Sequence, residues 1–373
     1  MKRRHLIKGL GAGAIVAGIA ACGQEQATTA VSENRKVHRW KMVTTWPPNF
    51  PGAGVGANRL AKRIEKASNG RIRIKVYGSD ELVPAYETFD AVSTGRVQMA
   101  HGAAYYWKGK APAAQFFAAV PFGMNAQEMN AWLYYGGGWE LWKELYAPFN
   151  LMPAPAGNTG TQMAGWFNKE INSVEDLKGL KMRIPGLGAE VLKRAGGTPV
   201  NVPGADIFTA LQTGTIDAAE WIGPYNDLVL GLHKAAKYYY YPGWHEPCAT
   251  LEAIFNQQEF DSLPEDLQEI VLLSCQAAND DMLADYTAQN QRALRVLASE
   301  HGIIPKPLPE SVLRRLKQLS LEVLEELAAE DDVVARVYAS YREFQRNTSQ
   351  WLGISEKAYF DARLLGDAGN YSP

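Results

Sequence analysis

Three short segments carry side chains that together could bind a small carboxylic acid. Arg183 closes GLKMR at 179–183, where an extended segment follows a glycine-marked turn. The segments GNTGTQMAGWF at 157–167 and GTIDAAEW at 214–221 add two amides and a carboxylate. A guanidinium presents its donors in a fixed planar fork that matches a carboxylate, which a lysine cannot reproduce. This combination predicts a site for a small carboxylate.

The sequence gives little support to an enzyme or a nucleotide-binding protein. It contains no HExxH or CxxC pair, and its histidines are dispersed, so a zinc hydrolase is poorly supported. No GxSxG elbow is present for a serine hydrolase. The glycine run at 136–138 fits a helix end and turn better than a phosphate loop, because no GxxxxGK[ST] or GxGxxG accompanies it.

The N-terminus has the pattern of an export signal. MKRRH at 1–5 is positively charged, an apolar stretch follows, and small residues precede Cys22. The apolar part, about 13 residues over 9–21, is too short for a bilayer span of about 20 helical residues. IAAC at 19–22 resembles a bacterial lipoprotein box, and RR at 3–4 resembles a twin-arginine signal, so the Sec and Tat routes both stay open. We predict a signal over 1–22 with lipidation at Cys22, then a flexible tether over 23–37.

Length and composition restrict the remaining possibilities. About 350 residues follow the signal, which is more than one typical hydrophobic core holds and predicts two lobes. A net charge of −2 gives no reason to expect nucleic-acid binding. Besides Cys22, the chain contains only Cys248 and Cys275. An exported location permits a disulfide between them, but two buried free thiols fit equally well.

Hydrophobic periodicity predicts an α/β fold followed by long helices. Alternation over 38–45 and 71–77 indicates strands, and helical spacing over 54–68 between them indicates a βαβ unit. A second α/β stretch covers about 158–245, and 251–256 is expected to return as a strand to the first lobe. Long helical periodicity then occupies 264–297, 309–327 and 333–352. A chain that leaves a lobe and returns makes a hinge, and ligands favour the cleft between lobes.

The tyrosine run at 238–241 allows two interpretations. Four aromatic side chains could form a ligand cage, or they could belong to a strand that packs on both faces. We favour the strand, because tyrosine has a high strand propensity and a proline and a glycine follow directly.

Several long segments in the same order resemble the extracytoplasmic solute-binding subunits of tripartite ATP-independent periplasmic (TRAP) transporters, and most closely the branch that binds 2-oxo acids and lactate. The resemblance covers essentially the whole chain after the tether. It is carried by HGAAYYWKGK at 101–110, AVPFGMNAQEMNAW at 119–132, GNTGTQMAGWF, GLKMR, GTIDAAEWIGPYND at 214–227 and YYYYPGWHE at 238–246. An isolated arginine at a strand end more often pairs with a surface acid. The long match reverses those odds for Arg183.

The resemblance implies a two-lobed, type II-like periplasmic binding protein with a hinge, a long helix between the lobes and a helical C-terminal region. We expect lobe I over 38–158, with a return segment over about 248–308, lobe II over 159–247, and C-terminal helices over 309–373. Relatives in this branch form dimers by exchanging a C-terminal helix, and this chain is expected to do the same.

The resemblance also implies a set of site residues. Arg183 stands where the family grips the ligand carboxylate. In the 2-oxo acid branch a sodium or calcium ion bridges protein and ligand, and its protein ligands correspond here to Gln162, Glu220 and the main-chain carbonyl of Trp221. Hard cations prefer such oxygen ligands. Further expected contacts with the ligand come from Asn158, Tyr105, Glu246, Trp46 and Phe167.

The function implied is capture of a small 2-oxo or 2-hydroxy monocarboxylate, such as pyruvate, another 2-oxo acid or lactate, without catalysis. The partners would be the membrane permease subunits of the transporter, and the location would be periplasmic with a lipid anchor. A TRAP binding subunit for a sugar acid or an aromatic acid is one alternative, because the arginine clamp would be shared. An envelope enzyme acting on a small carboxylic acid is the other.

Overall fold

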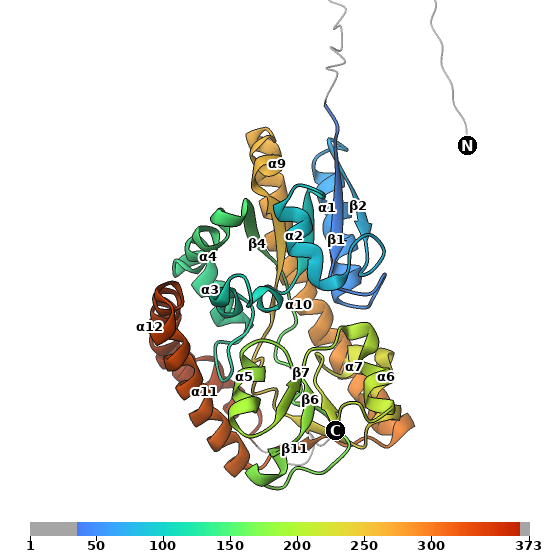
Figure 1. Ribbon diagram of the computed structural model, residues 1–373, viewed down its shortest axis with the longest axis vertical. Coiled ribbons are helices and arrows are strands. Elements are labelled where there is room, and N and C mark those ends of the chain that lie inside the picture. Colours follow the sequence, from blue (N-terminus) through green and yellow to red (C-terminus); the bar gives the residue numbers. More distant parts are fainter. Residues whose placement is uncertain (1–35, 366–373) are drawn as a thin grey trace, which may run out of the picture. The chain divides into compact units, whose positions relative to one another are not determined.

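The computed structural model describes residues 36–365 (Figure 1). The predicted export signal, Cys22 and nearly all of the tether lie outside this range and stay predictions. Within 36–365, no helix combines the length and the apolar character that crossing a membrane requires.

A five-stranded mixed sheet forms the first half of the fold. Its strand order is β2-β1-β3-β10-β4, in which β1 pairs in parallel with β2 and β3, and β10 pairs antiparallel with β3 and β4. The strands are β1 (His38–Thr44), β2 (Ile72–Tyr77), β3 (Met99–Gly102), β4 (Leu151–Asn158) and β10 (Thr250–Asn256). The predicted βαβ unit is confirmed, because α1 (Ala53–Ala67) connects the parallel strands β1 and β2. Asn69 and Gly70 end this connection with positive φ angles of 52° and 74°.

A second, six-stranded mixed sheet positions the predicted site residues. Its order is β11-β9-β5-β8-β6-β7, with β6 parallel to β7 and β8, and β5 antiparallel to β8 and β9. The strands are β5 (Gly165–Phe167), β6 (Lys181–Arg183), β7 (Thr198–Val200), β8 (Ala218–Ala219), β9 (Tyr238–Tyr241) and β11 (Lys306–Pro307). The tyrosine run is therefore a strand, as favoured, and its central residues Tyr239 and Tyr240 are buried.

The two sheets draw their strands from different stretches of the chain. The first sheet uses residues of 38–158 and 250–256, and five strands of the second lie within 159–247. The sixth, β11, lies in the stretch assigned to the return to lobe I, but Lys306 pairs with Tyr240 in the second sheet. The chain has therefore crossed back before residue 306. Independent movement of the two halves stays a prediction.

Helix α10 (Glu265–His301) contacts elements of both halves. It packs against β4 and α1 in the first half and against α7 (Pro224–Leu230), which follows β8 of the second sheet (Figure 1). The 37-residue helix matches the expected long helix between the lobes. The α/β architecture with a helical C-terminal region is thereby confirmed.

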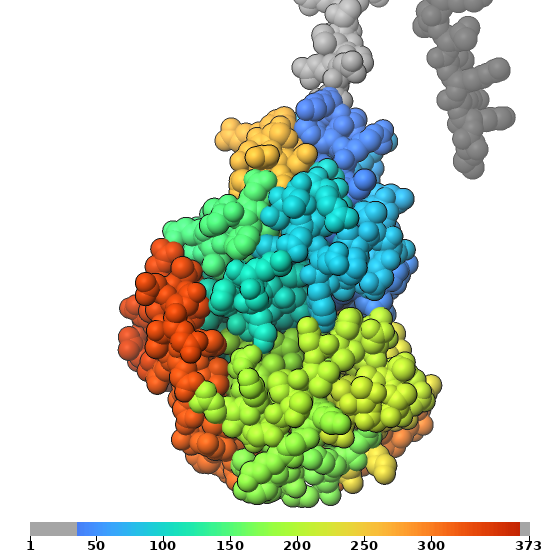
Figure 2. All heavy atoms as spheres, in the orientation of Figure 1, coloured from blue at the N-terminus to red at the C-terminus, as the bar shows by residue number. Residues whose placement is uncertain are grey.

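The C-terminal helices make a second connection between the halves. The helix α11 (Glu310–Glu330) packs on α5 (Gly186–Arg194), which lies between β6 and β7 of the second sheet. The next helix, α12 (Asp332–Ile354), packs on α3 (Ala126–Tyr135), on α4 (Gly138–Tyr146) and on the 3-10 helix η3 (Pro112–Phe117). Figure 2 shows this orange and red segment along one flank of both halves. A last helix, α13 (Glu356–Arg363), has no buried residue.

Aromatic packing anchors α12 to the first half. The ring of Phe117 stacks between Trp132 and Trp142, with centroid separations of 5.5 Å and 5.0 Å. Tyr341 of α12 meets Trp132 edge to face at 5.1 Å, and its hydroxyl accepts the main-chain N–H of Met124 at 2.7 Å. Such aromatic pairs contribute about 0.5–1.5 kcal/mol each beyond the area they bury.

Two further sequence questions are settled by the packing. The glycine run at 136–138 ends α3 and begins α4, with Gly137 in the left-handed region at a φ of 81°, as expected. Cys248 and Cys275 are separate, buried free thiols, so the disulfide alternative is excluded for them. Burial raises the pKa of the Cys248 thiol to about 12, which keeps it protonated at neutral pH.

Glu252 of β10 gives the fold a pH dependence that can be tested. Its buried carboxyl accepts hydrogen bonds from Trp107 Nε1 and the Tyr146 hydroxyl, and burial raises its pKa from 4.5 to about 7. Its contribution to stability is therefore present below about pH 4.5 and is lost as the pH rises through about 7. We expect Glu252→Gln to reduce the fall in the free energy of unfolding between about pH 5 and pH 8, measured by urea denaturation. The exposed control Glu343→Gln should keep the wild-type slope, and an equal slope in both variants would contradict the assignment.

Candidate functional site

Strand pairing brings Arg183 and Glu220 to the same end of neighbouring strands. Arg183 is the last residue of β6 and lies opposite Ala219 of β8, so Glu220 follows directly beside it. The main-chain N–H of Glu220 donates to the Arg183 carbonyl at 3.2 Å. Arg183 is 1% exposed and Glu220 is fully buried. The sheet therefore holds a guanidinium and a carboxylate side by side, away from water.

The Arg183 guanidinium has two of its three nitrogens already engaged. Nε donates to the Val202 carbonyl at 3.1 Å, and Nη1 donates both to the Glu220 carbonyl at 3.1 Å and to Glu220 Oε1. Nη2 is buried without a hydrogen-bond partner, and the guanidinium lies 4.9 Å from the Trp221 ring. Burial alone would lower the pKa of Arg183, but the charge of Glu220 raises it. A permanently charged Nη2 is thus the donor that this side chain can offer to an anion.

A group of buried oxygen and nitrogen atoms lies next to this pair. Glu220 Oε2 lies 3.2 Å from His245 Nε2, and one ligand atom each from Glu220, His245 and Glu246 fall within 4.8 Å of one another. Gln162 Nε2 donates to Glu246 Oε2 at 2.7 Å, while Gln162 Oε1 is buried without a partner. Burial, followed by the charge of Glu220, raises the pKa of Glu246 well above its usual range.

This atom set fits a hard cation. Gln162 Oε1 is a buried acceptor that lacks a donor, and leaving such an atom unpaired costs about 1–3 kcal/mol. Two buried carboxyl groups also share a single guanidinium, and a cation beside them would favour the ionised form of Glu246, which burial and the charge of Glu220 disfavour. Oxygen donors of these kinds are the ones that sodium and calcium prefer. The residues present therefore fit the predicted metal, with Gln162, Glu220 and Glu246 as side-chain donors.

Residues of the first half close over this group. Trp46 follows β1 and is buried, and its ring lies edge-on to Trp221 at 6.4 Å. Tyr105 is buried, and burial together with the charge of Glu246 raises the pKa of its hydroxyl well above the usual range. Asn158 ends β4, and its side chain donates to Thr250 Oγ1 at 3.2 Å and accepts from the Gly160 N–H at 2.9 Å. Its amide is therefore already used in holding the chain between the two sheets.

Phe167 is the one predicted contact that the structure does not bring to this group. It belongs to β5, and its ring packs against Tyr240 at 5.3 Å in the core of the second sheet. The strand alternation in β5 directs Trp166, not Phe167, to the core that contains Trp221.

Sequence reasoning missed three residues of the group. His245 was read as one of several dispersed histidines, although its neighbour Glu246 was a candidate. Tyr106 and Tyr86 lie close enough to Arg183 for its positive charge to oppose the rise in their pKa values that burial causes. The tyrosine pair at 105–106 lies within HGAAYYWKGK, but nothing in the spacing of this segment shows which ring faces the arginine.

Contacts between the halves surround the group. The Tyr86 hydroxyl donates to Asn201 Oδ1 at 3.1 Å, and Lys108 Nζ pairs with Glu190 at 2.8 Å. Asn226 Nδ2 donates to the Pro51 carbonyl at 2.9 Å. A cavity of about 150 Å³ lies along this seam and is lined mainly by apolar and aromatic residues: Tyr105, Tyr106, Lys108, Ile184, Pro185, Gly186, Ala189, Glu190, Pro199, Val200 and Asn201. Ile184 directly follows Arg183 in the chain, so this cavity adjoins the end of β6, the strand that carries Arg183.

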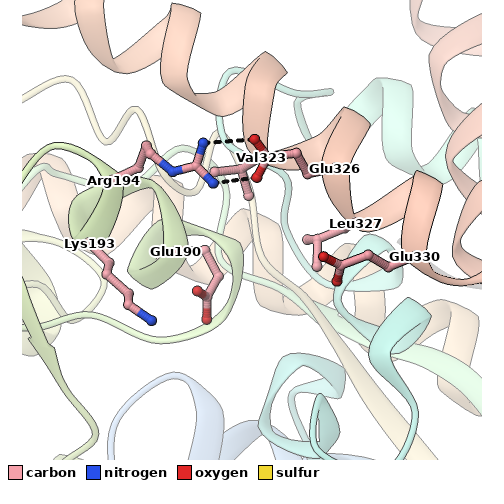
Figure 3. A pocket seen from close by; sticks show the side chains of 7 residues that line it. All are labelled: Glu190, Lys193, Arg194, Val323, Glu326, Leu327 and Glu330. Atoms are coloured by element: carbon pink, nitrogen blue, oxygen red, sulfur yellow. Dashed lines mark hydrogen bonds and ion pairs between the residues drawn. The ribbon is translucent and has the colours of Figure 1, made fainter.

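Another cavity, of about 390 Å³, lies between α5 and α11 (Figure 3). Its lining includes the exposed pair of Arg194 and Glu326, joined by two hydrogen bonds, and none of the candidate site residues. Exposed ion pairs of this kind contribute little and are common on surfaces. This cavity therefore gives no reason to move the predicted site away from Arg183.

The family described as bacterial extracellular solute-binding protein, family 7 (DctP), matches residues 42–331. The chain belongs to this family. It is 42% identical over 360 residues to a monocarboxylate 2-oxoacid-binding periplasmic protein of Nostoc sp. (strain PCC 7120), covering 96% of this chain and 98% of the relative. The predicted resemblance to TRAP solute-binding subunits is thereby confirmed.

Three solved TRAP solute-binding proteins have a closely similar structure. The protein from Pseudoalteromonas atlantica T6c, with bound sodium and pyruvate, is 44% identical with a TM-score of 0.85, covering 87% of this chain and 99% of that one. The protein from Colwellia psychrerythraea, with calcium and pyruvate, is 45% identical with a TM-score of 0.85, covering 88% and 100%. The protein from Bordetella bronchiseptica RB50, with calcium and picolinate, is 37% identical with a TM-score of 0.87, covering 89% and 99%. The family model ends at residue 331, whereas these solved structures cover 87–89% of the chain.

The seam contact of Tyr86 can be tested in this DctP-family chain. Tyr86→Phe removes only the hydroxyl, which donates to Asn201 and also lies beside the Arg183 guanidinium. Loss of one such hydrogen bond costs about 0.5–1.5 kcal/mol, so the free energy of unfolding should fall by about that amount in urea denaturation. Tyr135→Phe, at a site 93% exposed, is the matched control and should be as stable as the wild type. Equal stabilities of both variants would show that the Tyr86 hydroxyl does not help to hold the halves together.

Proposed function

We propose that this chain captures a small 2-oxo or 2-hydroxy monocarboxylate through Arg183 and a bridging sodium or calcium ion. The observation that carries the proposal is one buried set of complementary atoms. Arg183 Nη2 is a charged donor without a partner, and Gln162 Oε1 is an acceptor without a partner, on the side chain whose Nε2 donates to Glu246. One end of the site is therefore suited to a carboxylate and the other to a cation.

The residues divide the recognition between two parts of the ligand. Arg183 would bind the carboxylate, while Gln162, Glu220, Glu246 and the Trp221 carbonyl would hold the cation. When bound, the cation would supply a Lewis-acidic centre for oxygen atoms of the acid, which favours acids with an oxygen at C2. Trp46, Tyr105 and Trp221 would exclude water and cover the apolar part of the acid. Tyr105 would also donate to a ligand oxygen through its buried hydroxyl.

The relatives support this assignment. Two solved structures above 40% identity contain pyruvate, one with sodium and one with calcium, and the Nostoc relative is named for 2-oxoacid binding. The proposal includes no catalysis: the two halves would close around the acid and deliver it to the permease subunits in the membrane. A ligand stabilises the closed arrangement only by the difference between its affinities for closed and open forms. Export and lipid attachment at Cys22 complete the proposal, and the mass of the mature N-terminus would check them.

An aromatic carboxylate is the second candidate. The Bordetella relative contains picolinate with calcium, and the seam cavity of about 150 Å³ beside Tyr105 and Ile184 offers apolar space for a larger acid. A sugar acid is supported less well, because few polar side chains line that cavity.

Calorimetric titration of the metal-stripped protein without its signal tests the proposal. Pyruvate, lactate, 2-oxobutyrate and picolinate are each titrated with sodium, with calcium and with neither. We expect a C2-oxygenated acid to bind and to require a cation. Arg183→Ala should weaken binding by more than about 30-fold, because losing one partner of a buried charged pair costs about 2–5 kcal/mol.

The exposed Arg194→Ala variant on α5 is the control for Arg183 and should retain wild-type affinity. Binding that is indifferent to cations would remove the metal from the proposal. Near wild-type affinity of Arg183→Ala would remove the clamp, and preference for picolinate would favour the aromatic alternative.

We also propose that the chain forms a homodimer by exchanging a C-terminal helix. The end of α12 and α13 expose large apolar side chains, which in a monomer would remain in water. They are Trp351, Ile354, Tyr359, Phe360 and Leu365, each at least 51% exposed.

Light scattering at micromolar concentration tests the dimer. The full mature chain should have twice the monomer mass, and a variant ending at Ser355 should lose the dimer, because it lacks α13. A strictly monomeric full chain would overturn this proposal without affecting the ligand site.

A further inference from the structure

Glu220 is shared between the two functions that the proposed site combines. Its Oε1 pairs with Arg183, the proposed clamp for the carboxylate, and its main-chain carbonyl accepts from the same guanidinium nitrogen. Its Oε2 lies 3.2 Å from His245 Nε2 and belongs to the group of ligand atoms suited to a cation. One buried carboxylate thus serves as counter-ion for the anion-binding group and as donor for the cation.

Because Arg183 and Glu220 are both buried, each of them strongly affects a ligand that approaches the other. Glu220 is fully buried and Arg183 is 1% exposed, so water screens their attraction poorly. An anion that approaches Arg183 Nη2 is attracted by the guanidinium and repelled by the adjacent carboxylate. A cation that approaches Glu220 Oε2 is attracted by the carboxylate and repelled by the guanidinium. Each partner of the ion pair therefore weakens the binding of the ligand that the other partner attracts.

We propose that Glu220 makes binding of the cation and of the carboxylate mutually dependent by this competition. A cation at Glu220 offsets its charge and leaves Arg183 free to attract the acid, and an acid at Arg183 leaves Glu220 free to attract the cation. This inference rests on the proposed function and adds a mechanism of coupling to it. By linkage, each ligand must then raise the affinity for the other by the same factor.

The competition predicts gains of affinity, which simple bridging by a metal does not. If the cation only bridged protein and acid, every removal of a metal ligand would weaken binding or leave it unchanged. If Glu220 also restrains Arg183, removing its charge must strengthen the binding of the acid when no cation is present. Removing the charge of Arg183 must likewise strengthen the binding of the cation when no acid is present.

The first arm of the test replaces the carboxylate by its neutral isostere. Glu220→Gln keeps an oxygen that can accept from Arg183 Nη1 but removes the charge. In calorimetry without cations, we expect its affinity for pyruvate to exceed that of the wild type by about fivefold or more, in line with typical coupling of 5–150-fold. Addition of calcium should then change this affinity by less than about twofold.

Gln162→Leu is the matched control for the first arm. It removes a proposed metal donor but leaves the pair of Arg183 and Glu220 intact. Calcium should no longer raise its affinity for pyruvate. Its affinity for pyruvate without cations should not exceed that of the wild type. A gain in both variants, or in neither, would overturn the proposal.

The second arm uses the cation alone. Arg183→Met removes the guanidinium charge and keeps much of the apolar stem. Titrated with calcium in the absence of any carboxylate, it should bind at least about fivefold more tightly than the wild type. Unchanged or weaker calcium binding by a variant that retains the wild-type circular dichroism spectrum would overturn the proposal. If Glu220→Gln does not fold, the calcium titration of Arg183→Met alone tests the proposal.

The two arms separate this inference from the proposed function. Failure of the wild type to bind any of the acids, with or without cations, would remove the proposed function. The calcium titration of Arg183→Met would still give its own answer, because it uses no acid. Conversely, cation-dependent pyruvate binding with no gain in either variant would keep the function and remove the competition.

Discussion

The ion pair of Arg183 and Glu220 is the interaction on which the rest of the site depends. A guanidinium without water costs several kcal/mol unless a partner and further acceptors offset the loss, and here Glu220 and the Val202 carbonyl do so. The pairing of β6 with β8 sets the two residues side by side, so the sheet register is itself part of the recognition. A shift of one residue would place Arg183 on the opposite face and separate the charges.

The site joins the two sheets through groups of different character. The second sheet contributes the charges, Arg183 and Glu220, whereas the first half contributes rings such as Trp46 and Tyr105, which cover those charges. Charged groups attract the ligand from a distance, and the aromatic cover then lowers the local dielectric and strengthens the same attraction. Separation of the halves would rehydrate the charges, so affinity and closure are linked through the amount of water at Arg183.

Much of this arrangement follows from sequence patterns, and the exceptions have physical causes. The βαβ unit, the tyrosine strand and α10 were predictable because their periodicity extends over many residues. The strand β4 was not, because LMPAPAGN is buried on both faces and contains two prolines, which suit its position at the sheet edge. Arg183, Glu220 and Gln162 were predicted as site residues from long matching segments. His245 and Tyr86 depend on tertiary approach, which no local spacing encodes, and Phe167 was misplaced because two residues of a strand point to opposite faces.

The C-terminal helices add a mechanical constraint to this picture. The helix α11 is packed on α5 beside the second sheet, while α12 is locked to the first half through Tyr341 and the stacked rings of Phe117 and Trp132. Between them stands a single extended residue, Asp331, whose carboxylate caps the main-chain N–H groups of Val333 and Val334. Any rotation of one half against the other would therefore also have to change the torsion angles of this residue. If the halves separate, the C-terminal helices would thereby limit how far the site opens.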